Sequence, residues 1–409
     1  MHRSNSRTLL VSSSLLIATL AGCAGQGNYT RQGVSAAKER MSFLKSATEW
    51  ELARQAFLAG DLEKALDKVE TSLSINDTVV KSHVLKGRIL IEMGDLSNAL
   101  KTLNTAVTLD PYDSDGHYYL GVIHERINQP ELAQASFEQA CELDDYNPVY
   151  AVAAAEMLID LDRIEDAKAY LGSIPMAENN AGIRQTLGHI ALIERDTALA
   201  VKCFDEARML APDDEGIVED LVHAQLQAGK WNDAERNISL LLKKPKNAER
   251  RDLKILHAKA LANTGRAIEA RSIYQELLSS SEGKSDVDSW VGMANASFML
   301  NDMRGVRKAA SRVVAMAPDA HDGYLLYAMY HRQTGDLDSA LASIENALRR
   351  RPVDAGMFAF RALVLTDLDR QKDAIASVTR AVELEPSNPR YAKMLTQITS
   401  GTYAGVVVD

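Results

Sequence analysis

The stretch GDLEKAL at residues 60–66 recurs as GDLSNAL at residues 94–100 and as GDLDSAL at residues 335–341. The first two copies begin 34 residues apart. The alanine at the sixth place of this stretch recurs along most of the chain, at Ala65, Ala99, Ala133, Ala167, Ala200, Ala234 and Ala270, then as Val306, and again at Ala340 and Ala374. Intervals of 33 to 36 residues over so many copies indicate an internal repeat of the length found in solenoid proteins.

The residue types within one period predict two helices joined by a tight turn. A glycine such as Gly60 can end the first helix in the left-handed conformation, and an aspartate such as Asp61 can cap the second helix. A proline then stops the second helix, because it cannot continue an α-helix. Small residues allow the two helices to cross closely, at Ala53, Gly87, Gly121, Ala155 and Gly188 in the first helix and at the recurring alanines in the second.

A helix–turn–helix unit of this length, with small residues at places 8, 20 and 27 and proline at place 32, resembles the tetratricopeptide repeat (TPR). The resemblance implies an all-α, right-handed superhelical solenoid of about ten repeats with a C-terminal capping helix. In this register the repeats start at residues 46, 80, 114, 148, 181, 215, 251, 287, 321 and 355.

The repeat register divides the chain into segments. Repeats 1–7 would occupy residues 46–286, repeats 8–10 residues 287–388, and a capping helix and tail residues 389–409. A polar insertion, Ser279–Ser285, would form a mobile loop or a slight bend between the two groups of repeats. The tail from Gly401 could dock on the last helix or be disordered.

The amino terminus resembles that of a bacterial lipoprotein. Basic residues precede an apolar stretch, Leu9–Leu20, that is too short to span a bilayer, and LAGC at residues 20–23 resembles a lipobox. The resemblance implies a cleaved signal peptide at residues 1–22 and acyl chains on Cys23. Residues 23–45 would then hold the lipidated cysteine, a flexible tether at residues 24–33 and a leading helix. The alternative is an ordinary signal peptide followed by a chance cysteine.

The residue after the cysteine bears on the destination of such a lipoprotein. Ala24 stands where an aspartate would favour retention in the inner membrane. By the sorting rule of enterobacterial lipoproteins, we expect a lipid anchor in the outer membrane, with the solenoid facing the periplasm.

Charge and motifs exclude several function classes. A formal net charge of −10 argues against nucleic acid as a partner. Lys284 and Ser285 follow Gly283 as in a phosphate-binding loop, but Leu278 stands where that loop needs its first glycine. We expect no enzyme activity, no cofactor, no metal and no small-molecule substrate.

Two other groups of residues have structural interpretations. His189 and His223 could face one another and hold a metal with Glu219 or Gln185, but we expect polar residues that line a groove. Cys141 and Cys203 lie two repeats apart, so we expect two buried thiols and no disulfide.

In the TPR family the first helix of each repeat lines a concave groove. The resemblance therefore implies a peptide-binding groove near the anchor, formed by Trp50, Arg54, Val84, Arg88, Tyr118 and Val122. This apolar and aromatic surface with two arginines would suit an amphipathic helix or an extended peptide with an acidic flank. The alternative is that Trp50 and Tyr118 only cover neighbouring helices.

A lipobox followed by such repeats resembles the architecture of the assembly lipoproteins of tight-adherence and type IV pili. The expected function is a protein-binding scaffold in the assembly of such a pilus or a related secretion apparatus, with a secretin or pilus component as partner. The alternatives are a scaffold for exopolysaccharide export and an adaptor for a periplasmic protease or peptidoglycan hydrolase.

Overall fold

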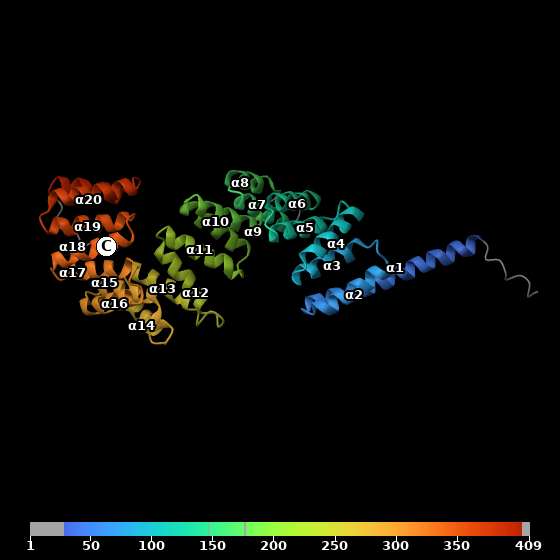
Figure 1. Ribbon diagram of the computed structural model, residues 1–409, viewed down its shortest axis with the longest axis horizontal. Coiled ribbons are helices and arrows are strands. Elements are labelled where there is room, and N and C mark those ends of the chain that lie inside the picture. The colour runs from blue at the N-terminus through green and yellow to red at the C-terminus, as the bar shows by residue number, and fades with distance from the viewer. Residues whose placement is uncertain (1–27, 146, 176, 403–409) are drawn as a thin grey trace, which may run out of the picture. The chain divides into compact units, whose positions relative to one another are not determined.

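The structure, a computed structural model of the chain, describes residues 28–145, 147–175 and 177–402 (Figure 1). The described residues form twenty-one α-helices and two short 3-10 helices, with no strand among them. The predicted all-α class is therefore confirmed. The expected signal peptide, the lipidation site at Cys23 and the tail at residues 403–409 lie outside the described residues.

The helices alternate as the repeat pattern predicts. The first helices of the ten repeats are α1 (Asn28–Leu58), α3 (Val80–Glu92), α5 (Ser114–Arg126), α7 (Pro148–Asp160), α9 (Ala181–Ile193), α11 (Glu215–Gln227), α13 (Arg251–Asn263), α15 (Val287–Met299), α17 (Asp322–Gln333) and α19 (Ala355–Asp367). The second helices are α2 (Leu62–Ile75), α4 (Leu96–Leu109), α6 (Pro130–Leu143), α8 (Ile164–Ser173), α10 (Thr197–Leu210), α12 (Trp231–Leu242), α14 (Ala267–Leu277), α16 (Met303–Met316), α18 (Leu337–Arg350) and α20 (Gln371–Leu384).

A final helix, α21 (Pro389–Thr399), follows the last repeat. Ile398 of this helix is fully buried against Ala374 and Val378 of α20. The expected capping helix is therefore confirmed, and it covers the apolar face that the last repeat would otherwise leave open.

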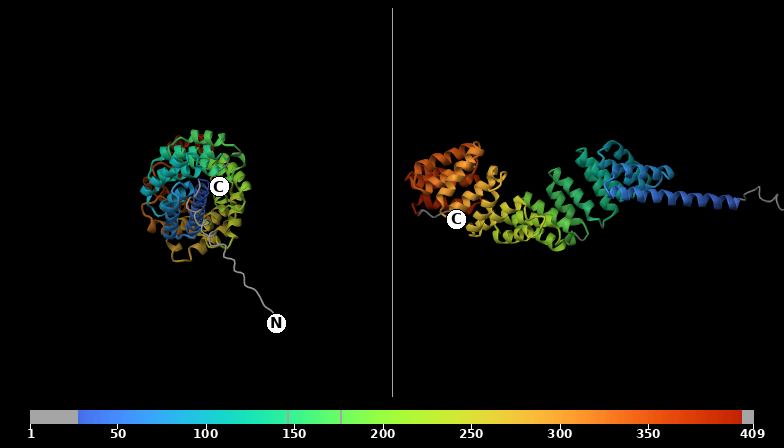
Figure 2. Two further views of the ribbon diagram at one scale, coloured as in Figure 1. Left: turned by 90° about the vertical axis from the view of Figure 1, so that its right-hand side faces the viewer. Right: turned by 90° about the horizontal axis from the view of Figure 1, so that it is seen from below.

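Two segments differ from the simplest interpretation of the sequence. Helix α1 begins at Asn28, inside the segment expected to be a flexible tether, and continues without a break through the first helix of the first repeat, as the right-hand view of Figure 2 shows. The polar insertion is closed into a turn that contains the short helix η2 (Gly283–Ser285). In this turn the Gly283 N–H donates to the Ser280 hydroxyl at 2.9 Å.

The chain divides into two compact units, one ending at Thr186 and one beginning at Leu187, so that the boundary falls within α9. Successive helices from α1 to α8 and from α10 to α21 pack on one another in chain order. The other short helix, η1 (Ala177–Asn179), precedes this boundary. No helix in the described part of the chain is long and apolar enough to cross a membrane.

The turn inside every repeat has the same backbone geometry. Its fifteenth residue has a positive φ in all ten repeats, and only five of these residues are glycines, at positions 60, 94, 229, 265 and 335. The other five are Asn128, Asp162, Arg195, Asn301 and Asp369. In the first repeat Gly60 N–H donates to Phe57 O and Asp61 N–H to Ala56 O, each at 3.0 Å. These two bonds define the Schellman motif, which satisfies the last carbonyls of the first helix.

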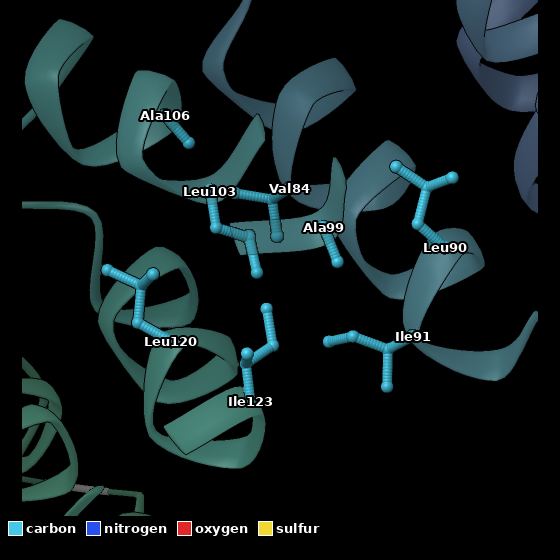
Figure 3. Close-up of a cluster of buried hydrophobic side chains, with 8 residues drawn as sticks. All are labelled: Val84, Leu90, Ile91, Ala99, Leu103, Ala106, Leu120 and Ile123. Carbon is cyan, nitrogen blue, oxygen red and sulfur yellow. The ribbon is translucent and has the colours of Figure 1, made fainter. Parts of the chain in front are cut away.

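The two helices of a repeat cross where the first helix carries a small residue. Gly87 lies against Leu103, and Gly121 lies against the ring of Phe137. A methyl group added at Gly121 would lie 2.5 Å from two atoms of that ring. Buried apolar side chains around these crossings form a core that continues from one repeat into the next. An example is the cluster of Val84, Leu90, Ile91, Ala99, Leu103, Ala106, Leu120 and Ile123 (Figure 3).

The crossing predicts a cost for adding a single methyl group. We expect Gly121→Ala to lower the free energy of unfolding by about 1–3 kcal/mol, the usual cost of overpacking. The matched control is Gly172→Ala in α8, where nothing lies within 4 Å of the added methyl group and stability should not fall. Urea unfolding followed by circular dichroism measures both changes, and equal stability of the two variants would contradict the prediction.

At the turn within a repeat, a substitution to glycine is expected to raise stability, in contrast to the loss expected at the helix crossing. Arg195 is exposed and has a φ of 62°. The left-handed conformation costs a non-glycine residue roughly 1–2 kcal/mol. We therefore expect Arg195→Gly to raise the thermal midpoint and Gly229→Arg, at the same place in the next repeat, to lower it. A shift of both midpoints in the same direction would show that backbone conformation does not decide stability at these turns.

Candidate peptide-binding groove

The first helices α1, α3 and α5 enclose a cavity of about 220 Å³. We call it the first-repeat cavity, and it is lined by Trp50, Arg54, Lys81, Val84, Leu85, Arg88, Asp113 and Asp115. Four of the six residues that the sequence predicts for the groove therefore come together. The structure does not place Tyr118 and Val122 among the lining residues.

Trp50 and Val84 form the apolar part of this cavity. The Trp50 indole is half-buried, and its Nε1–H donates to the Lys81 carbonyl oxygen at 3.1 Å. This bond ties α1 to the start of α3 and holds the indole in place. Val84 is only 6% exposed and belongs to the core, so it contributes a floor and little accessible surface.

The two predicted arginines have different surroundings. The Arg54 guanidinium donates to both carboxylate oxygens of Glu51, at 2.9 and 2.8 Å, and this pairing holds the pKa of the Glu51 carboxyl below its ordinary value. Arg88 lies between two aromatic rings, 5.1 Å from the Phe57 centroid and 4.9 Å from the Tyr119 centroid. Arg88 is therefore held by cation–π contacts, which leave its N–H groups available to a ligand.

Carboxylates close the other side of the cavity. Asp113 caps α5 by accepting from the Gly116 N–H at 2.7 Å, and burial raises the pKa of its carboxyl. Asp115 accepts a hydrogen bond from the Tyr150 hydroxyl at 2.9 Å. The cavity thus presents both signs of charge, which suits a polar peptide backbone better than a uniformly acidic ligand.

Tyr118 and Val122 pack between repeats. The Tyr118 ring lies 5.5 Å from Phe137 and 5.0 Å from Tyr150, measured between centroids. Val122 packs against the same cluster. Tyr118 therefore covers neighbouring helices, as the alternative interpretation of the sequence expected. Helical periodicity identifies the face on which a residue lies but does not show how deeply it is packed.

A larger cavity of about 480 Å³ lies on first helices of the second unit. Places 2, 5 and 9 of the repeat contribute to it as they do to the first-repeat cavity, and place 13 contributes as well. Its lining includes Ile255, Lys259, Asn263, Asp288, Val291, Asn295 and Asp322, together with neighbouring core residues. The groove predicted from the sequence did not include this cavity. The repeat register contains the signal for it, since places 2, 5, 9 and 13 supply these residues.

The polar residues considered as metal ligands have other partners. His189 Nε2 lies 3.2 Å from Asp220 Oδ2, and Glu219 accepts from Arg250 Nη2 at 2.9 Å. Among the described residues no group of three or more histidines, cysteines or carboxylates could hold a metal ion. Cys141 and Cys203 are buried thiols, as expected from their spacing.

Comparison with known families identifies the repeats. Residues 87–128 match the family model described as TPR repeat, and residues 115–147 and 326–389 match models described as tetratricopeptide repeat. The chain therefore contains tetratricopeptide repeats. Such repeats indicate a scaffold for protein–protein interaction, and no catalytic family is indicated.

Two characterised proteins are similar over part of their length. Protein FlbA of Caulobacter vibrioides is 29% identical over 193 residues, which cover 46% of this chain and 32% of that protein. Heat shock protein STI1 of Saccharomyces cerevisiae is 28% identical over 142 residues, which cover 34% of this chain and 22% of that protein. The matches thus span about a third or less of the length of these relatives.

Solved structures of TPR proteins are similar to the chain at low sequence identity. Yeast Tom70 is 14% identical with a TM-score of 0.41, and the match covers 88% of this chain and 81% of Tom70. A thermophilic TPR protein of Thermus thermophilus is 20% identical with a TM-score of 0.38, and the match covers 44% of this chain and 99% of that protein.

The surroundings of the two arginines predict different effects on stability. We expect Arg88→Ala to lower the free energy of unfolding by about 1 kcal/mol, because two aromatic rings lose their cationic contact. Arg54→Ala is the control, since its pair with Glu51 is exposed and such pairs contribute little. Urea unfolding measures both variants. A larger loss for Arg54→Ala than for Arg88→Ala would contradict the assigned contacts.

Proposed function

We propose that this protein is a lipid-anchored scaffold of the outer membrane that holds a partner protein in its first-repeat cavity. The process it serves is the assembly of a tight-adherence or type IV pilus, or of a related secretion apparatus. The partner is a secretin or a pilus component. The observation that carries the binding role is the cavity that α1, α3 and α5 enclose at the groove places of the repeat.

The chemistry of the cavity defines how a segment would bind. The fixed Trp50 indole offers a rigid apolar surface, and such side chains often contribute most to interface energy. Arg88, which has no hydrogen-bond partner among the described residues, offers donors on one side, while Asp113 and Asp115 offer acceptors on the other. An extended backbone between these groups could pair both its carbonyl and its N–H groups. An apolar side chain of the segment would lie on the indole.

The membrane part of the proposal rests on the sequence. The apolar stretch at residues 9–20 and the LAGC motif at residues 20–23 support lipidation at Cys23. Helix α1 begins only five residues later and leads directly into the first repeat. The anchor would therefore lie at the same end of the chain as the first-repeat cavity.

Site-specific crosslinking in the native envelope tests the proposal. We expect a photo-reactive benzoylphenylalanine at position 54 to form an adduct with a secretin or pilus component. The matched control carries the same group at position 236, where Arg236 is exposed on the second helix α12, and should not form this adduct. Mass spectrometry of the adducts identifies the partner. Equal adducts from both positions would remove the groove from the proposal.

Two further outcomes separate the parts of the proposal. Adducts with a polysaccharide-export channel or with a hydrolase, in place of a pilus component, would replace the proposed process with one of the alternatives. Cys23→Ala should abolish labelling by radioactive palmitate and release the protein from the outer-membrane fraction. Retained labelling would show that Cys23 is not the lipidated residue.

A further inference from the structure

A second cavity of about 480 Å³ lies on the second-helix side of the repeats, between α14 and α16. We call it the basic cavity. Its lining comes from α14, the polar insertion, α15 and α16, namely Arg271, Gln275, Leu278, Ser279, Lys284, Trp290, Met293, Ser297, Asp302, Gly305, Lys308 and Arg312. The insertion that lengthens this repeat therefore forms one wall of a cavity.

The basic cavity is separate from the cavity described above on the first helices α13, α15 and α17, which we call the groove cavity. Helix α15 contributes Val291 and Asn295 to the groove cavity and Trp290, Met293 and Ser297 to the basic cavity. At about 100° per residue these two sets lie on opposite sides of one helix. A ligand in the basic cavity would therefore not compete with a peptide in the groove.

The charge of this region is opposite to that of the whole chain. Four basic side chains line the cavity against one carboxylate, Asp302, whose Oδ2 lies 3.8 Å from Arg271 Nη1. A neighbouring cavity of about 800 Å³ shares Lys308 and Arg312, adds Arg304 and Arg307, and has no acidic residue in its lining. The formal net charge of the chain is −10, so this concentration of positive charge is local.

Four of these basic groups lie on α16 and are exposed, namely Arg304, Arg307, Lys308 and Arg312. Within the part of the chain that the structure describes, they form no ion pair. The basic turn at residues 243–246 differs, because Lys244 and Lys246 pair with Glu215 at 2.9 and 3.0 Å. The cations of α16 are therefore available to a partner.

The floor of the basic cavity is apolar and well fixed. Leu278 and Trp290 are each 8% exposed, and the Trp290 Nε1–H donates to the Lys284 carbonyl oxygen at 3.1 Å. Ser297 lines the same cavity, and its buried hydroxyl has no hydrogen-bond partner among the described residues. An apolar floor beneath a cationic rim is suited to a ligand that carries both an apolar group and carboxylates.

We propose that the basic cavity binds an acidic segment of a partner protein, with one apolar side chain in the cavity. Flanking carboxylates of the segment pair with Lys284, Lys308 and Arg312. The volume is that of a site for an organic group, far more than an inorganic ion fills. The acidic surface of the remaining chain disfavours a long polyanion, whereas a short acidic segment meets only the local positive charge.

Fluorescence anisotropy with the full chain tests this proposal. The probe is a fluorescein-labelled nonapeptide of aspartates and glutamates with a phenylalanine at its centre. We expect saturable binding that weakens as salt rises, because the rim pairs are exposed. Replacing the central phenylalanine by glycine should weaken binding about fivefold, since the apolar floor then stays empty. Equal binding of the two peptides would overturn the role of the floor.

Charge reversal at the rim supplies the matched comparison. Lys308→Glu combined with Arg312→Glu should weaken probe binding at least about tenfold. The control, Lys202→Glu with Arg236→Glu, makes the same change of charge on exposed side chains of α10 and α12 and should leave binding within about twofold. Unchanged circular dichroism spectra establish that both variants fold. Equal effects of the two pairs would overturn the proposal.

Other anions and the groove itself provide the remaining comparisons. Displacement of the probe by inorganic phosphate at the same concentration as the peptide, or tighter binding of RNA or phosphatidylglycerol vesicles that Lys308→Glu with Arg312→Glu abolishes, would overturn the assignment to a peptide. Trp50→Ala should leave probe binding unchanged, because the first-repeat cavity is a different site. Loss of probe binding in Trp50→Ala would overturn the assignment to the basic cavity.

Discussion

The close crossing of the two helices within each repeat is the contact on which the rest of this structure depends. Gly87, Gly121 and Gly188 each lie against a bulky side chain of the second helix. Those side chains, Leu103, Phe137 and Phe204, are almost fully buried. Because interiors are packed as densely as organic crystals, a single added methyl group at the crossing has no free space to occupy. The crossing fixes how the first helices lie, and the groove residues stand on those helices.

The turn that follows each first helix complements this crossing. The same pair of backbone hydrogen bonds closes all ten turns, whether the residue with positive φ is a glycine or not. The geometry is therefore imposed by the packing of the two helices and not by glycine alone. Aspartate and asparagine tolerate this conformation better than other residues, and they fill four of the five non-glycine places. Arg195 is the exception.

The sequence predicts the repeat register well, because the local roles of glycine at the turn, alanine at the crossing and proline after the second helix do not depend on the rest of the fold. Every first helix from α3 to α19 begins at, or one residue after, the place where the register puts it. The start of α1 at Asn28 is not predicted, since the glycines before residue 34 favour a tether, whereas the sequence does predict a leading helix after that tether. Residues 33–41 and 43–45 of α1 are exposed, so this part of the helix extends the first helix of the repeat without being specified by packing.

The candidate sites are predicted less completely. The places expected to face the groove follow from the register, and four of the six residues at them, Trp50, Arg54, Val84 and Arg88, line one cavity. The packing of Tyr118 depends on Phe137 and Tyr150, which come from other helices. The basic cavity is not predicted from the sequence when the polar insertion at residues 279–285 is considered without the helices that pack beside it. The one-sided charge of α16, with four basic residues and no acid, is the signal that could have found it.

Because α1 is unbroken, its length determines both how far the first-repeat cavity lies from the start of the helix and the direction in which the cavity opens. From Asn28 to Trp50 the helix rises about 1.5 Å per residue, so the first-repeat cavity would stand about 33 Å from the start of the helix. Within α1 the opening of this cavity therefore has a fixed direction about the helix axis as well as a fixed height above Asn28. One inserted residue would change the height by little and turn the opening by about 100°. The number of residues in α1 therefore determines the direction in which the cavity faces. Only insertions close to whole helical turns would preserve that direction.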